Sequence, residues 1–395
     1  MQKFFNCAFL AGLLVLLVAV PVRLVTDGQY ETSAYYENRS LAARPDMNWQ
    51  TLWDGSYGSR FETWYSDHAP LRTTLLKTNA AMQMKLLKRP VVCDVVVTED
   101  VLLPKMDFSE WTQKDYENNA APIAENFGKL NDHITENGGS FYFVGFPEQR
   151  VYFEELFPDY MNNHETEAAI ADEVFESALT MAGVQFLNME AAFDADGRPA
   201  AYYSAVDHHY NYYGAYAGYR AILKELAADG WELPVLTEEN VDFVEHPNPY
   251  IGSRNRKLHN LWENGEKAVT LAEAPVPFTR TDNGQESNKP LFVLPAEDYL
   301  PTTYSLYMGG DFGETVLKTD RPELPDVLIF GDSFTNALET LLYASFDESR
   351  ILDLRHYKEQ SLKDYISAYQ PDIVLCVMND TFYYTTTGNG AVWED

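Results

Sequence analysis

Three short stretches, far apart in the chain, carry side chains that together could transfer an acyl group. Residues 326–334 (DVLIFGDSF) end an apolar run in Gly-Asp-Ser, residues 207–209 read Asp-His-His, and residues 372–380 (DIVLCVMND) end an apolar run in Asn-Asp. A serine hydroxyl becomes a strong nucleophile when a histidine takes its proton and an acidic group holds the imidazole in one tautomer. These residue types therefore point to nucleophilic catalysis on an acyl carbonyl.

Ser333 lies between two predicted elements that suit this chemistry. Residues 327–330 form an apolar run of strand length, and residues 336–346 carry apolar side chains at helical spacing. A serine at the end of a strand and the start of a helix has free backbone N–H groups and the helix dipole beside it, and both favour an oxyanion. The three-residue pattern alone is equally consistent with a tight turn in which Ser333 caps the helix.

The Asp-His-His stretch offers an acid and a base. Asp207, His208 and His209 fall in a loop, and a helix is predicted from residue 214 to residue 229. A carboxylate two positions before a histidine can hold the imidazole, and triads occur in several chain orders, so the position before Ser333 is no obstacle. The alternative is a metal site, since imidazole and carboxylate suit zinc. No further motif completes a metal shell, and we predict no metal and no cofactor.

Asn379 is the last candidate for the site. Its position at the end of an apolar run predicts a side-chain amide at a strand end, beside the backbone N–H of Ser333. One such oxyanion donor contributes about 10² to 10³ in rate, and we predict Ser333 and Asn379 as donors. Asn-Asp is also a common turn or helix cap, and the presence of Gly-Asp-Ser favours the catalytic interpretation.

The elements predicted around these stretches alternate between strand and helix. This alternation is typical of a parallel, doubly wound α/β sheet. The predicted strands are residues 140–146, 184–189, 327–330, 351–354 and 372–377, and the predicted helices between them are residues 120–137, 163–182, 336–346 and 361–369. Upstream, residues 61–87 have helical spacing interrupted at Pro70, and residues 91–103 are predicted to form a β-hairpin with its turn at Glu99 and Asp100.

Residues 4–22 are apolar apart from Asn6, which is about the length of a helix that crosses a bilayer. Because no clean cleavage site follows, we predict an uncleaved membrane anchor, with a cleaved signal peptide as the alternative. The net charge of −31, from 60 acidic and 29 basic residues, excludes an electrostatic footprint for nucleic acid. The predicted divisions are the anchor (1–25), a linker with a helical and hairpin extension (26–118), the first half of the sheet domain (119–230), an insertion (231–325) and the second half (326–395).

The three stretches resemble the blocks of the SGNH hydrolase superfamily, which assemble on a flavodoxin-like sheet. Here the Asp/His block precedes the serine block, and one residue rather than two separates Asp207 from His209. This circularly permuted order is similar to that of the alginate O-acetyltransferase (AlgX/AlgJ-like) group and closest to that of the bacterial DHHW proteins. Tyr210 departs from the pattern, because the family name has tryptophan there. Other shared positions are residues 37–39, 41, 54–56, 61–62, 67–68, 72, 214–216, 309–310 and 352–355.

The resemblance implies Ser333 as nucleophile, His209 as general base and Asp207 as its orienting partner, with no proton-transfer role for His208. It implies an extracytoplasmic O-acyltransferase that O-acetylates a cell-surface or secreted polysaccharide. It also implies a multispanning membrane acyltransferase that delivers the acyl group. Two alternatives stay open, a carbohydrate esterase or deacetylase that uses water as acceptor, and a non-catalytic polysaccharide-binding assembly protein. We predict that residues 231–325 decide the choice of acceptor, since long loops in compact domains are usually functional.

Overall fold

A computed structural model describes most of the chain, in two units. The units are Met1–Val97 with Asn255–Glu263, and Thr98–Arg254 with Asn264–Asp395. The described residues are 6–7, 9–14, 18, 22, 33–37, 39–106, 111–162, 164–263 and 265–393. Much of the predicted anchor at residues 4–22 lies outside them, and no helix within the described ranges has the length and apolar character needed to span a bilayer.

The smaller unit is mainly helical. Its helices are α2 (Trp49–Trp53), α3 (Ser56–Asp67) and α4 (Arg72–Ala81), the last continued by a π-helical turn (Met82–Leu86). The predicted interruption at Pro70 is confirmed, because α3 ends before it and Leu71 takes a left-handed φ of 64° before α4 begins. Its short strands are β1 (Ser33–Ala34), β2 (Arg39–Ser40), β3 (Val91–Val92) and β4 (Val95–Val97).

The predicted turn at Glu99 and Asp100 is confirmed, because these residues connect β4 to β5 (Leu102–Pro104), its neighbour in a three-stranded sheet of order β3-β4-β5. A second turn was not predicted: strands β3 and β4 pair antiparallel around Cys93 and Asp94. Both turn residues have left-handed φ values, 50° for Cys93 and 58° for Asp94, as a two-residue turn of type I′ requires. Neither residue is the glycine that usually signals this turn, so the sequence pattern did not reveal it.

The larger unit contains a mixed sheet of eight strands in the order β11-β10-β12-β14-β13-β15-β6-β7. Its strands are β6 (Ser140–Phe146), β7 (Gln185–Asn188), β10 (Thr279–Asp282), β11 (Gln285–Glu286), β12 (Glu314–Lys318), β13 (Val327–Gly331), β14 (Glu348–Leu352) and β15 (Ile373–Asn379). The five strands predicted to be parallel are so, from β14 to β7. Strand β14 begins three residues earlier than predicted, because Glu348 and Ser349 are polar and did not indicate a strand.

The sheet is not purely parallel, which corrects the prediction. Strands β12, β10 and β11 come from the insertion at residues 231–325 and extend the sheet antiparallel beyond β14. An unpaired β14 would present free N–H and C=O groups to solvent, and β12 pairs with it instead. The insertion thus contributes three strands to the sheet as well as connecting its two halves. It also contains a separate antiparallel pair, β8 (Phe243–Pro249) and β9 (Lys267–Leu271).

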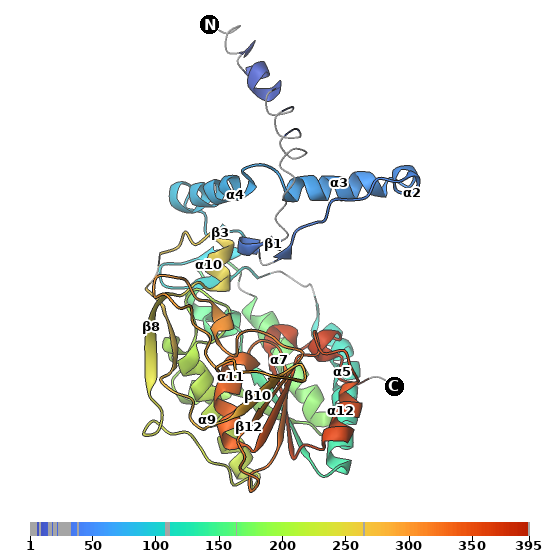
Figure 1. The fold of residues 1–395 in the computed structure, drawn as a ribbon, viewed down its shortest axis with the longest axis vertical. Helices are drawn as coiled ribbons and strands as arrows, with labels where there is room; N and C mark the ends of the chain where they lie inside the picture. The colour runs from blue at the N-terminus through green and yellow to red at the C-terminus, as the bar shows by residue number, and fades with distance from the viewer. Residues whose placement is uncertain are drawn as a thin grey trace. The chain divides into compact units, whose positions relative to one another are not determined.

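Helices cover both faces of the sheet (Figure 1). On one face lie α5 (Gln113–Glu136), α7 (Glu165–Met181) and α12 (Leu362–Tyr369), whose apolar side chains form a core with Phe143, Phe330 and Cys376. On the other face lie α8 (Met189–Ala195), α9 (Tyr212–Ala228) and α11 (Thr335–Leu342). Short elements complete the fold: β5 (Leu102–Pro104), α6 (Gln149–Tyr152) and α10 (Ser253–Lys257). The carboxyl ends of β13, β15 and β6 meet at one edge, where ligands of open α/β sheets bind.

Candidate active site

Ser333 lies where β13 gives way to α11, as the sequence predicted. Gly331 is required there by close packing, since a Cβ at this position would lie 1.8 Å from the carbonyl oxygen of Val377 on β15. The buried Asp332 side chain then fixes the turn by accepting the backbone N–H of Phe334 at 2.9 Å and of Asn379 at 2.8 Å. Burial raises the pKa of Asp332. The turn thus holds Ser333, which is half-buried, between two neighbouring strand ends.

Asp207, His209 and Ser333 form one hydrogen-bonded chain. The Nδ1 atom of His209 lies 2.6 Å from Asp207 Oδ1, and its Nε2 atom lies 2.7 Å from Ser333 Oγ. Asp207 and His209 are 3% and 4% exposed, so water reaches the chain mainly at the serine. The structure therefore brings together the three residues whose types suggested nucleophilic catalysis, although His209 and Ser333 are 124 positions apart in the sequence.

The loop before α9 holds Asp207 in place. Ser204 Oγ accepts the backbone N–H of Asp207 at 2.9 Å, and the backbone N–H of Ser253 donates to Asp207 Oδ2 at 2.6 Å. Burial alone would raise the pKa of Asp207, but the adjacent His209 and His208 and the hydrogen bonds hold it well below its usual range. The carboxylate is therefore ionised and fully engaged, with one oxygen on His209 and the other on backbone.

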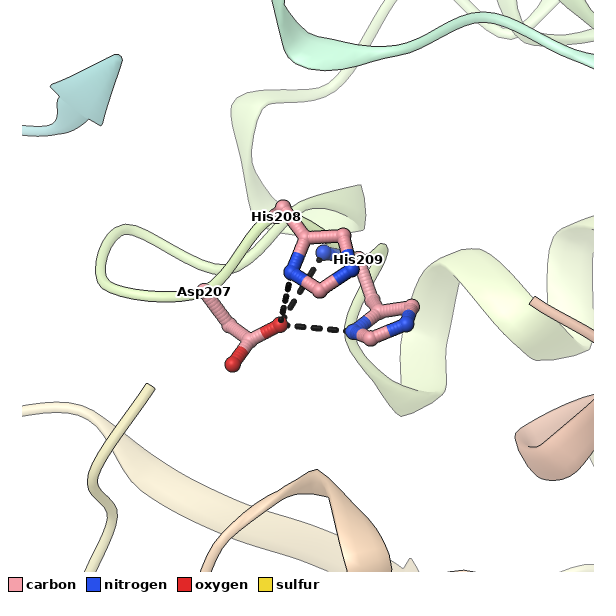
Figure 2. Close-up of side chains that lie close together, drawn as sticks. All are labelled: Asp207, His208 and His209. Atoms are coloured by element: carbon pink, nitrogen blue, oxygen red, sulfur yellow. Dashed lines mark hydrogen bonds and ion pairs between the residues drawn. The ribbon is translucent and has the colours of Figure 1, made fainter. Parts of the chain in front are cut away.

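Figure 2 shows His208 next to His209, and the two ring centroids are 3.7 Å apart. The two imidazoles approach the same carboxylate oxygen of Asp207, at 2.6 Å for His209 and 3.3 Å for His208. The Nδ1 atom of His208 also lies 2.7 Å from Ser253 Oγ. The side chain of His208 is 39% exposed against 6% for His209. His208 thus links the Asp207 loop to residue 253, and His209 is the histidine hydrogen-bonded to Ser333.

Asn379 lies at the end of β15, close to the serine turn, and is 2% exposed. Its side-chain Nδ2 donates to Asp332 Oδ2 at 2.7 Å, and its Oδ1 accepts the backbone N–H of Thr381 at 3.0 Å. An amide nitrogen carries two hydrogens, so Nδ2 has one more to donate. Asn379 thus caps the turn that follows it, which is the alternative role predicted from the sequence. This cap is compatible with the oxyanion role.

One aromatic residue that the sequence did not single out contacts His209. Tyr304 stacks on the imidazole, with ring centroids 3.6 Å apart and planes 4° apart. Tyr210, the departure from the tryptophan of the family name, is buried and donates its hydroxyl hydrogen to the backbone carbonyl of Phe334. The length of residues 231–325 pointed to a segment that contacts the site, but nothing in its sequence marked Tyr304 as the contacting residue.

A buried polar network holds the neighbouring loops at the same sheet edge. The Arg254 guanidinium donates to Gln149 Oε1 at 2.8 Å and to Glu148, both just after β6, and the backbone N–H of Arg254 donates to Val206 at 3.0 Å. The backbone N–H of Glu148 donates to Asp380 Oδ2 at 3.0 Å. Arg254 therefore ties the Asp207 loop and its neighbour Ser253 to the sheet. Sequence patterns did not reveal this network, because its members are scattered over 233 residues.

The same side chains are also possible metal ligands. Asp207, His208 and His209 offer ligand atoms within 4.8 Å of one another. Both ring nitrogens of His209 are already in hydrogen bonds, to Asp207 and to Ser333. A cation bound there would have to displace one of them, and would compete with proton transfer from the serine. The arrangement is better suited to proton transfer than to metal coordination.

Comparison with known proteins supports the resemblance seen in the sequence. Residues 108–296 match the model of the family described as SGNH hydrolase-like domain, acetyltransferase AlgX. A structure of Bacillus cereus PatB1 with a sulfonyl adduct is 20% identical, with a TM-score of 0.62 over 76% of this chain and 98% of PatB1. A DHHW family protein from Eubacterium siraeum is 21% identical, with a TM-score of 0.54 over 75% of this chain and 96% of its own. No curated protein matches the sequence.

The predicted family resemblance is thereby confirmed, and at these identities the two solved structures establish the shared fold. The geometry adds a chemical capacity. An ionised, buried carboxylate, an imidazole and a serine hydroxyl stand in hydrogen-bond contact at the end of a strand. Such a chain can activate a serine oxygen for attack on a carbonyl carbon.

Proposed function

We propose that this protein is an extracytoplasmic O-acyltransferase acting on a cell-surface or secreted polysaccharide. The match of residues 108–296 to the SGNH hydrolase-like domain of the acetyltransferase AlgX supports this proposal. The observation that carries the proposal is the hydrogen-bonded chain, with His209 2.6 Å from Asp207 and 2.7 Å from Ser333. The transferred group is acetyl, by analogy with the acetyltransferase named in the family description. Ser333 is the nucleophile, His209 the general base and Asp207 the residue that orients it.

In the first half-reaction the acyl group moves to the enzyme. His209 Nε2 accepts the hydroxyl proton while Ser333 Oγ attacks the donor carbonyl, and the carbonyl oxygen becomes an oxyanion. The backbone N–H of Ser333 and the remaining amide hydrogen of Asn379 stabilise this oxyanion. His209 then protonates the leaving oxygen of the donor, the carbonyl re-forms, and Ser333 carries the acyl group as an ester. Asp207 stabilises the imidazolium throughout.

In the second half-reaction the acyl group leaves for the acceptor. His209 takes the proton of a sugar hydroxyl, whose oxygen attacks the ester carbonyl, and Ser333 Oγ departs with the proton that His209 returns. Water in place of the sugar would give hydrolysis, so the chemistry of an esterase is the same up to this step. Acceptor choice depends on the segment that covers the site and on how well it excludes water.

The proposal also covers the location of the protein and its partner. Residues 4–22 anchor the chain in the membrane, and the catalytic unit faces the extracytoplasmic side, where the polysaccharide is found. One anchor cannot carry an acyl group through the bilayer. A multispanning membrane acyltransferase is therefore the proposed partner that delivers it.

The test combines a chromogenic acetyl ester with sugar acceptors. The purified protein is incubated with p-nitrophenyl acetate, with and without cello-, chito- and uronate oligosaccharides, and mass spectrometry follows both the sugars and the peptide that contains Ser333. The expected results are acetyl-Ser333 and an acetylated oligosaccharide. The matched control is Ser333→Ala, which should form neither.

Each other result has a defined meaning. Acetyl-Ser333 with release of acetate and no acetylated sugar in any acceptor series would favour the esterase. Absence of both acetyl-Ser333 and ester turnover would favour the non-catalytic binding protein. Loss of turnover on treatment with a chelator, restored by zinc, would favour the metal site and overturn the proposed mechanism.

A further inference from the structure

Tyr304 reaches the site from a segment that supplies none of the acid, base or nucleophile. It begins a 3-10 turn, Tyr304–Leu306, within the insertion. Its ring lies parallel to the imidazole of His209, with centroids 3.6 Å apart and planes 4° apart. Tyr304 is 6% exposed, and Phe334 approaches the same imidazole at 5.1 Å with a 50° tilt. The His208 ring lies 3.7 Å from the same imidazole at a 38° tilt, so the parallel ring of Tyr304 is the flat contact that His209 makes with the insertion.

The turn that carries Tyr304 is fixed by backbone hydrogen bonds. On one side, the N–H of Thr302 donates to Pro249 at 2.9 Å, and on the other the N–H of Val293 donates to Leu306 at 2.7 Å. Tyr307 packs edge-on against Tyr304, with centroids 5.1 Å apart. The stacked ring is thus held by three parts of the insertion, so its position does not depend on His209.

His209 needs such support at one stage of the proposed reaction in particular. Before acylation, its ring is held at both nitrogens, by Asp207 and by Ser333. Once Ser333 Oγ is esterified it has no hydrogen to donate, and only the bond to Asp207 remains. A flat ring stacked on the imidazole face then resists tilting, and its π-electrons attract the imidazolium that forms at each proton transfer.

We propose that Tyr304 is a positioning residue that holds His209 in the orientation for proton transfer, an inference that rests on the proposed acyl transfer. The ring does this, and the hydroxyl is not required. The insertion thereby takes part in the chemistry through the base. Stacking and cation–π contacts of this kind correspond to about a 5- to 30-fold effect on rate.

The experiment compares three variants of the full-length protein. Tyr304→Phe keeps the stacked ring, Tyr304→Leu removes it, and Tyr116→Leu removes an equally buried tyrosine, 6% exposed, from α5, where it packs on Trp111 and Tyr384. For each variant, kcat and KM for p-nitrophenyl acetate, the melting temperature and the rate constant for sulfonylation of Ser333 by phenylmethanesulfonyl fluoride are measured.

The expected pattern separates positioning from packing. Tyr304→Phe should stay within about twofold of the parent, whereas Tyr304→Leu should lower both kcat and the sulfonylation rate about 5- to 30-fold with little change in KM. Tyr116→Leu should lower the melting temperature and leave both rates of the folded protein unchanged. If Tyr304→Leu does not fold, Tyr304→Met, with a longer side chain, replaces it.

Two results would overturn the inference. One is a folded Tyr304→Leu or Tyr304→Met protein with the parental kcat and sulfonylation rate. The other is a Tyr304→Phe protein as impaired as Tyr304→Leu, which would assign the role to the hydroxyl. An inactive parent protein would instead refute the proposed function, so the two failures can be told apart.

Discussion

Asp207 holds His209 more closely than it holds His208, at 2.6 Å against 3.3 Å. Its Oδ1 lies 2.6 Å from His209 Nδ1, and its Oδ2 is taken by the backbone N–H of Ser253 at 2.6 Å. His208 projects from the same loop to Ser253 Oγ, so its ring does not share the path to Ser333. The one-residue spacing between acid and base thus works because the loop turns tightly around the Ser204 hydroxyl, which accepts the N–H groups of Val206 and Asp207.

Substitution of the two histidines should therefore have unequal effects. His209→Ala removes the base and should lower kcat for p-nitrophenyl acetate nearly as much as loss of the serine. His208→Ala removes contacts to Ser253, to Asp207 and to the His209 ring but not the base, and should lower kcat less than about tenfold, with some loss of stability. Steady-state kinetics on both variants checks this. The reverse order of severity would mean that the acid–base register is wrong by one residue.

The serine itself gives a sharper prediction. Ser333→Ala should lower ester turnover by a factor on the order of 10⁶, as loss of a triad nucleophile does. The melting temperature should change little, because Ser333 is half-buried and its backbone N–H is kept. Turnover and thermal unfolding are measured on the same preparation. Retention of most of the activity would exclude Ser333 as the nucleophile.

Some site residues could be predicted from the sequence and others could not. Ser333, His209 and Asp207 were identifiable because their types and neighbours form short local patterns. Ser253 and Tyr304 were not, because a backbone N–H donor has no residue-type signature and a tyrosine is usually a packing residue. Both acquire their place only from tertiary contacts with the Asp207 loop.

At the scale of elements, the junctions between strands and helices create the site. The strand–turn–helix unit from β13 to α11 was predictable, since each element has a clear period and Gly331 breaks them apart. The addition of β12, β10 and β11 to the sheet was not predictable, because short strands in an irregular, proline-containing segment show no distinct hydrophobic period. What favours their pairing is the open edge of β14, a property of the folded sheet.

The Gly331 junction is predicted to tolerate no side chain. Gly331→Ala places a Cβ 1.8 Å from the carbonyl oxygen of Val377, so β13 and β15 must separate at the point where Asp332 joins them. The free energy of unfolding should fall by about 3 kcal/mol, and ester turnover should fall as well. Gly265→Ala is the matched control, since nothing lies within 4 Å of its Cβ position. Equal urea midpoints for the two variants would contradict the packing argument.

The insertion gives a second prediction at this scale. Residues 296–299 are largely exposed and precede the turn that holds Tyr304, and Asn248 Nδ2 donates to Glu297 and Leu300 backbone oxygens at 3.1 Å and 3.0 Å. Replacing residues 296–299 by two glycines should admit water and raise the ratio of hydrolysis to acyl transfer. The ratio is measured with an acceptor that the parent acetylates. An unchanged ratio in a stably folded variant would mean that this tip does not guard the acceptor.

At the scale of the whole molecule, the acidic composition places carboxyl groups inside the larger unit as well as on its surface. Burial raises the pKa of Glu339 on α11 to about 7, that of Glu266 to about 7 and that of Asp380 to about 6. These three groups bind protons more tightly in the folded protein than in the unfolded chain. Asp207 behaves oppositely, and its contribution to stability is lost only at pH values below the ordinary range of a carboxyl group.

The sign of the pH dependence follows from these directions. Between about pH 4.5 and pH 7 the folded state holds protons that the unfolded state has released, so raising the pH through this window lowers stability. The charged groups that act on Glu339 are Asp311, Arg280 and Asp353. Glu339 alone should make the free energy of unfolding about 1–3 kcal/mol lower at pH 8 than at pH 5. Glu339→Gln should remove this part and make the protein more stable than the parent at pH 8. Urea unfolding of the parent, of Glu339→Gln and of the exposed control Glu225→Gln is measured at both pH values. The prediction would be contradicted if the stability of the parent rose from pH 5 to pH 8 and that of Glu339→Gln rose by the same amount.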